Sequence, residues 1–157
     1  MIYKKTWKYI LVKEDSFKCN TLNFYRLKAL KDFGDVKKGD IEGYVKKYYN
    51  LSQKGNCWVY EGATIIGNAV VKDDAQLRNS ACLYNNVVVS NEAQVFGHAI
   101  ISGNARIKGN ARVRDFARVF DNVIVMDNAE VAGRANVYGN AIVKDNNQII
   151  NFDNVYL

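Results

Sequence analysis

The chain has 157 residues, of which 48% are hydrophobic, which suffices for one core and requires no second globular unit. No stretch approaches the roughly 18 apolar residues that cross a bilayer. The apolar run over residues 9–12 is too short for a signal peptide, so we expect a cytoplasmic protein without membrane contact. The formal net charge of +6 is uneven, because residues 1–58 hold 13 Lys or Arg against 6 Asp or Glu.

The first 56 residues form a basic segment with two predicted extended elements. Residues 7–12 read as a strand, and residues 25–29 alternate apolar with basic side chains, as a half-buried strand does. A helix over residues 22–33 that ends at Gly34 is the alternative. The positive charge fits either a solvated surface or contact with an anionic partner such as nucleic acid.

A six-residue repeat begins at residue 57. A Val, Ile or Leu occupies every sixth position from residue 59 to residue 155. Two residues before it, from Ala63 to Ala141, lies an alanine except at Val87 and Val123, and Cys57 extends this series towards the N-terminus. Strand side chains alternate between two sides, so this spacing predicts one very short strand in each repeat. The remaining residues, such as Gly103-Asn104 and Asp121-Asn122, tolerate left-handed backbone angles and predict turns. A unit of six residues cannot bury its apolar side alone, so the repeats must stack into a solenoid.

This pattern resembles the hexapeptide-repeat proteins, whose fold is an all-β, left-handed parallel β-helix with three repeats in each triangular coil. The resemblance implies about five coils of 18 residues over residues 57–157. Many family members place Gly directly after the aliphatic residue, whereas here Gly or Asp comes two residues after it. Residues 25–33 and 50–59 also resemble the first segment of YdcK-type hexapeptide proteins, which are frequent in phage and prophage genomes and are often labelled transferases. Residues 1–56 are therefore expected to cap the first coil, whose unpaired strand edges invite aggregation.

Outward-facing positions can be sorted into columns, because residues 18 apart lie above one another if a coil contains 18 residues. Two neighbouring columns, on the first and second of the three faces, are largely apolar. The outward positions of the third face are mostly polar, as expected for a solvent-exposed surface. An extended apolar ridge along one corner indicates association. The resemblance implies a homotrimer, with a dimer, or docking of the N-terminal segment on the ridge, as alternatives. The predicted interface consists of Ile66, Val70, Tyr84, Val88, Phe120, Ile124, Tyr138 and Ile142.

Few residues suit catalysis. Acyltransferases of the resembled class use a histidine as general base and acyl-coenzyme A as donor, and the sole histidine is His98. It occupies a turn slot that Asn fills in many other repeats, so a structural role is preferred to a catalytic one. The carbonic-anhydrase-like branch of the fold needs three histidines on zinc, so no metal is expected. Cys19, Cys57 and Cys82 lack metal or disulfide spacing, and Cys82, expected to point outward, has no accompanying base. The repeat also runs without the inserted loop that walls such active sites.

A stripe of arginines on the third face is the remaining candidate site. Arg78, Arg112 and Arg114 fall on that face and suit contact with an anion, and neutralisation by neighbouring aspartates is the alternative interpretation. Nucleic acid is therefore a less favoured partner than protein.

Three functions follow from the sequence, in order of preference. The first is a non-catalytic, oligomeric interaction or scaffold protein without a cofactor, as a phage or prophage accessory protein that binds a host macromolecule. The second is a coenzyme-A-dependent acyltransferase that uses His98 and acetyl-coenzyme A. The third is a nucleic-acid-binding protein that uses the basic N-terminal segment.

Overall fold

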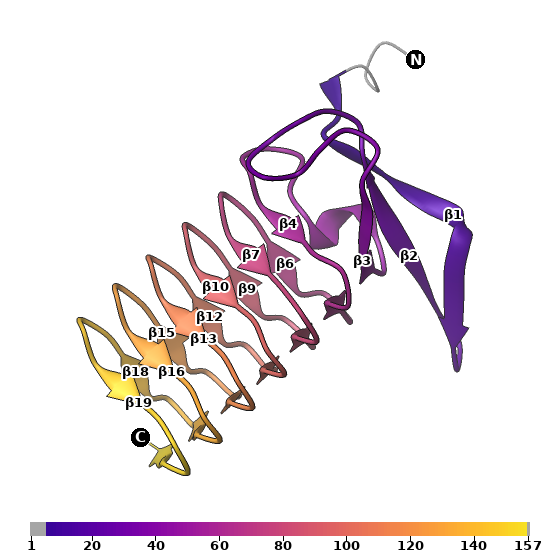
Figure 1. Ribbon diagram of the computed structural model, residues 1–157. Coiled ribbons are helices and arrows are strands. Elements are labelled where there is room, and N and C mark those ends of the chain that lie inside the picture. Colours follow the sequence, from indigo (N-terminus) through magenta and orange to yellow (C-terminus); the bar gives the residue numbers. More distant parts are fainter. Residues whose placement is uncertain (1–5, 157) are drawn as a thin grey trace.

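The computed structural model describes residues 6–156, which form a rod-shaped parallel β-solenoid with an antiparallel hairpin leaning out from its N-terminal end (Figure 1). The solenoid has three faces, each a stack of very short strands. The first face contains β5 (Thr64–Ile65), β8 (Cys82–Leu83), β11 (Ile100–Ile101), β14 (Arg118–Val119), β17 (Asn136–Tyr138) and β20 (Asn154–Tyr156). The second contains β6 (Val70–Val71), β9 (Val88–Val89), β12 (Arg106–Ile107), β15 (Ile124–Val125) and β18 (Ile142–Val143). The third contains β4 (Trp58–Val59), β7 (Gln76–Leu77), β10 (Gln94–Val95), β13 (Arg112–Val113), β16 (Glu130–Val131) and β19 (Gln148–Ile149).

The register of the strands confirms the 18-residue coil. Each strand pairs in parallel with the strand one coil away, as Ile107 does with Val89 and Val125. The aliphatic residue of each repeat and the small residue two before it point inward, and nearly all are fully buried. Their packing explains the all-β fold, because burying these columns is the main stabilising term.

Small and larger residues alternate in the inner column at the start of the second-face strands. From coil to coil this column reads Ala69, Val87, Ala105, Val123 and Ala141, all buried. Each valine therefore has an alanine above and below it. The two valines that interrupt the alanine series are thus accommodated by their neighbours.

Glycine alternates with Asn or Asp at two of the three corners, and the turns explain why. At the corner between the third and first faces, Asn79, Gly97 and Asp115 all have positive φ angles of 57°, 70° and 62°. The Asn79 side chain accepts a hydrogen bond from the Gly97 backbone N–H at 3.1 Å, and Asp115 does the same for Gly133 at 3.0 Å. A Cβ on Gly97 would lie 2.8 Å from the backbone nitrogen of Asp115. Each carboxylate or amide thus caps the next turn, where glycine leaves room.

The solenoid has about six turns, slightly more than the five expected. Leu51 forms a parallel bridge with Val71, which adds a further rung below β6 on the second face. Leu51 lies outside the strict six-residue register, so sequence spacing alone does not reveal it.

The N-terminal segment is β-rich, and the alternative of a helix over residues 22–33 is wrong. The elements are β1 (Tyr9–Cys19), β2 (Leu22–Ala29), β3 (Ile41–Val45) and the 3-10 turn η2 (Tyr48–Asn50). Strands β1 and β2 pair antiparallel, β2 pairs antiparallel with β3, and β3 pairs in parallel with β5. The hairpin is therefore continuous with the first face of the solenoid. Residues 22–29 are extended because alternate side chains, Leu27 and Ala29 among them, join the core.

Polar contacts fasten this segment over the first coil. Tyr9, Leu27 and Val45 belong to the same buried core as the solenoid. The ammonium of Lys8 is buried and donates to the Cys57 carbonyl oxygen at 2.8 Å and the Gly55 carbonyl oxygen at 3.2 Å. Burial lowers the pKa of Lys8. The expected division of the chain at residue 57 stays a prediction, since the core runs across it.

A second fastening lies on the third face. The Tyr60 hydroxyl donates to Asp35, whose carboxylate also pairs with Arg78 at 3.0 Å. These two contacts, the tyrosine first, lower the pKa of the Asp35 carboxyl. The Arg78 guanidinium lies 3.6 Å from the centroid of the Tyr60 ring. The loop that contains Asp35 is thereby held against the solenoid.

Candidate functional site

The corner between the third and first faces carries a stack of rings and a guanidinium where another corner carries amides. At the corner between the first and second faces, Asn86, Asn104 and Asn122 form a ladder in which each side chain bonds the next. At the third/first corner, the equivalent slots hold larger groups, one in each successive coil. We call these four residues the aromatic corner: His98, Phe116, Arg134 and Phe152.

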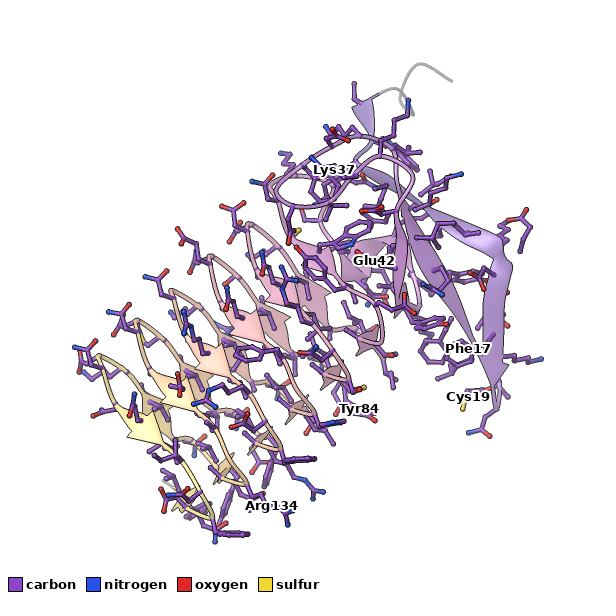
Figure 2. All side chains as sticks on the ribbon, viewed as in Figure 1. Phe17, Cys19, Lys37, Glu42, Tyr84 and Arg134 are labelled. Atoms are coloured by element: carbon purple, nitrogen blue, oxygen red, sulfur yellow. The ribbon has the colours of Figure 1, made fainter. Side chains whose placement is uncertain are left out.

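The members of the aromatic corner contact one another along the rod. The rings of His98 and Phe116 are stacked, with centroids 4.9 Å apart and an angle of 6° between planes. The Arg134 guanidinium lies 5.6 Å from the centroid of Phe116 and 5.8 Å from that of Phe152. Figure 2 shows Arg134 pointing outward from the edge of the rod. The 18-residue register produces this stack, because it superimposes the turn that precedes each side chain.

A pocket of about 430 Å³ opens beside this corner. Its walls are the rings of Phe116 and Phe152, which are 53% and 74% exposed. The outward side chains of Arg118 on β14 and Asn136 on β17 complete it with Arg134. Its lining residues include no carboxylate, and within residues 6–156 neither arginine forms an ion pair. Exposed rings with unpaired guanidinium groups suit a ligand that combines anionic oxygens with a planar group.

His98 lies at one end of the corner and is exposed. Its backbone N–H donates to the Asp115 carbonyl oxygen at 2.6 Å, which fixes the turn as in the other coils. Within the described residues, the imidazole nitrogens have no hydrogen-bond partner, so its ring is held by stacking on Phe116 alone. The imidazole is therefore free to form a hydrogen bond with a bound molecule.

The predicted interface residues do lie together on the first and second faces. Phe120 and Tyr138 are stacked with centroids 5.2 Å apart, and Tyr156 continues the stack at 5.0 Å. Tyr84 and Ile142 are 36% and 54% exposed, and the other members are partly exposed. Their role in association stays a prediction.

Two of the three arginines of the predicted stripe form ion pairs with neighbouring acidic residues. Arg78 is paired with Asp35, and Arg114 bonds Glu130 at 2.6 Å and Asp115 at 2.8 Å. The Glu130 contact comes first among the causes that raise the pKa of Arg114. Arg112 is exposed and has no such partner within residues 6–156. Contact of this stripe with an anion stays a prediction, and two of its three members would have to exchange an existing partner.

The cysteines are free thiols: Cys19 is exposed, Cys57 buried and Cys82 partly buried. Burial raises the pKa of Cys57 and of Cys82, which disfavours the reactive thiolate. No group of three potential metal ligands occurs among the residues that the structure describes. In the same part of the chain, no helix has the length and hydropathy needed to cross a membrane.

Most of the aromatic corner was not predicted from the sequence. His98 was expected in a turn, but Phe116, Arg134 and Phe152 were not expected beside it. A signal was present, because these residues share the 18-residue spacing of the turn slots. The apolar columns of the outer surface belong to the strands, whereas the column of His98, Phe116, Arg134 and Phe152 belongs to the turns.

A parallel β-solenoid with three six-residue repeats in each coil defines the class of hexapeptide-repeat β-helix proteins, and the chain fits that class. It is similar to the "Uncharacterized acetyltransferase YdcK" of Escherichia coli (strain K12), with 31% identity over 80 residues, or 50% of this chain. The chain covers 24% of the length of that relative. No family model matches the chain.

Proposed function

We propose that this protein is a coenzyme-A-dependent acyltransferase of the hexapeptide-repeat class. The observation that carries the proposal is that His98, the sole histidine, lies on the same corner as an arginine-lined pocket. The similarity to a protein named an acetyltransferase supports the same class.

The length of the aromatic corner fits a coenzyme A molecule lying along the rod. His98 and Phe152 are three coils apart, or about 14 Å at the usual spacing of neighbouring strands. In this arrangement the phosphates contact Arg118 and Arg134, and the adenine stacks on Phe152. The pantetheine arm then crosses Phe116 and brings the thioester to His98. The two arginines are charge-assisted donors to phosphate oxygens.

The chemistry assigned to His98 is general base catalysis. Its imidazole accepts the proton of an acceptor hydroxyl or amine as that group attacks the thioester carbonyl. The new bond joins acyl carbon to oxygen or nitrogen, and the carbon–sulfur bond breaks with coenzyme A leaving as thiolate. That thiolate then takes up the proton held by the imidazole.

Binding of acetyl-coenzyme A tests the proposal directly. We expect acetyl-coenzyme A to raise the melting temperature and to bind measurably in calorimetry. Arg134→Gln should weaken binding by about tenfold or more, because it removes a charged contact with phosphate. His98→Ala should retain binding but abolish the release of free coenzyme A in the presence of an accepted acceptor.

A matched control separates the pocket from general charge. Arg106→Gln removes one positive charge from the second face, away from the pocket, and should leave binding unchanged. If millimolar acetyl-coenzyme A neither stabilises the protein nor binds in calorimetry, the acyltransferase proposal is wrong.

We further propose that the apolar ridge forms the subunit interface of a homotrimer. The stack of Phe120 and Tyr138, which are partly exposed, with the exposed Tyr156 supports association, since burying such rings contributes favourably. The double substitution Tyr84→Lys with Phe120→Lys should convert the oligomer into monomers, as measured by light scattering. Gln94→Lys with Gln148→Lys adds the same charge on the third face and should not. An unchanged assembly in the first variant contradicts this interface.

The preferred sequence-based hypothesis, a non-catalytic scaffold from a phage or prophage, has gained no support and stays a prediction. A cytoplasmic location is part of our proposal. It is supported by three free cysteines, which suit a reducing compartment.

A further inference from the structure

A second hollow lies at the other end of the molecule, between the hairpin and the turn η2. It measures about 480 Å³ and is lined by Leu11, Tyr25, Tyr48, Tyr49 and three lysines, Lys13, Lys46 and Lys47. A smaller hollow of about 170 Å³ adjoins it towards Thr21 and Asn23 and shares Tyr25 and the last two lysines. We call the two together the N-terminal groove.

The groove exists because the hairpin is longer than the core that it caps. On the inner side of β1 and β2, Tyr9 and Leu27 are fully buried. One step further along the same side, Leu11 and Tyr25 are only partly buried. Figure 1 shows the outer half of the hairpin continuing away from the solenoid. The inner side of the hairpin is therefore buried at Tyr9 and Leu27 and becomes partly exposed surface at Leu11 and Tyr25.

The aromatic rings of the groove are exposed and held in place. Tyr48 is 42% exposed; its hydroxyl accepts a hydrogen bond from the Leu11 backbone N–H at 3.2 Å, and its ring packs against Trp7 at 5.2 Å. Tyr49 is 44% exposed, and its hydroxyl donates to the Asn68 side chain at 2.7 Å. Rings fixed in this way lose little conformational entropy when a planar group stacks on them.

The charge of the groove is positive and uncompensated. Its lining residues include no carboxylate. Within residues 6–156, none of Lys13, Lys46 and Lys47 forms an ion pair. Asp15, on the same hairpin, is paired with Arg26 at 3.6 Å. The Lys47 ammonium lies 5.9 Å from the centroid of Tyr49, so charge and ring are adjacent.

We infer that the N-terminal groove binds single-stranded nucleic acid. Proteins commonly bind single strands with a row of basic side chains beside exposed aromatic rings. The basic groups contact the phosphates of the nucleic acid, and the bases stack on the rings. A duplex keeps its bases stacked inside and cannot offer them to the tyrosines. An acidic peptide would use the lysines but leave the rings without a partner. This site is separate from the aromatic corner and does not depend on acyl transfer.

Fluorescence anisotropy with labelled oligothymidylate and oligouridylate tests the inference. We expect binding that weakens with salt, with a slope in the logarithmic plot of about −2 if all three lysines contact phosphates. Lys46→Gln with Lys47→Gln should reduce affinity by about tenfold at low salt. Tyr49→Leu should reduce it by about fivefold or more, through the loss of one stacked base.

The control variant is Lys72→Gln with Lys108→Gln, which removes the same charge from the second face of the solenoid and should leave binding intact. Equal losses in the two lysine variants, or equal binding of a duplex or of polyglutamate, would overturn the inference.

Ultraviolet cross-linking of the unmodified protein gives a second measurement that does not depend on the variants folding. The cross-linked nucleotide should map to Tyr25, Tyr48 or Tyr49, and mapping elsewhere contradicts the site. Because none of these variants touches the pocket beside Arg134, acetyl-coenzyme A binding should be unchanged, so the two proposals can fail separately.

Discussion

Ile107→Ala is expected to lower the free energy of unfolding by about 2–5 kcal/mol. Ile107 is fully buried in the middle of the rod and pairs with Val89 and Val125 of the adjacent coils. The substitution leaves a cavity in a coil that neither neighbour can fill, because each coil is held in register by the next. Chemical denaturation followed by circular dichroism measures the loss.

The control for this prediction is Arg112→Ala, an exposed position one repeat further along the chain. It should change stability by less than about 0.5 kcal/mol. A loss below about 1 kcal/mol for Ile107→Ala would show that the inner columns are less tightly packed than the structure indicates.

Lys8→Met is expected to lower the free energy of unfolding by about 2–3 kcal/mol, since the carbonyl oxygens of Lys54, Gly55 and Cys57 lose a buried charged donor. The effect should depend on pH. The pKa of Lys8 in the folded protein lies below the ordinary value of 10.5, so the unfolded chain holds the proton more firmly. Stability contributed by Lys8 therefore rises with pH between the lowered pKa and 10.5, and the difference between wild type and variant should grow over that range.

Lys28→Met serves as the matched control, because Lys28 is exposed on β2. It should have little effect at any pH. If Lys8→Met is as stable as the wild type, the ammonium does not fasten the N-terminal segment to Gly55 and Cys57.

The solenoid was predictable from the sequence because its register repeats. Every inner column, Val87 and Val123 included, could be read from spacing alone, and so could the apolar character of the Phe120 and Tyr138 column. The extra rung at Leu51 could not be predicted in this way, because Leu51 lies two residues out of register. Periodicity identifies only the repeated part of the chain, and the N-terminal cap is not repeated.

The candidate sites were harder to predict for a related reason. His98, Phe116 and Arg134 share a spacing but not a chemical type, so they form a column only once the turns are superimposed. In the N-terminal groove, Leu11 and Tyr48 are brought together by the hairpin fold, and no local pattern links them. The excess of positive charge in residues 1–58 was visible, but not which lysines lack a partner.

The alternation of glycine with Asn or Asp at two of the three corners, together with that of alanine with valine in one inner column, limits how such a rod can change in length. Deleting the coil that contains Ala105 would place Val87 next to Val123, and deleting the coil that contains Asp115 would place Gly97 next to Gly133. Removing or adding two coils preserves both alternations. Length variants that differ by pairs of coils keep both alternations, and we expect them to fold more readily than variants that differ by one coil.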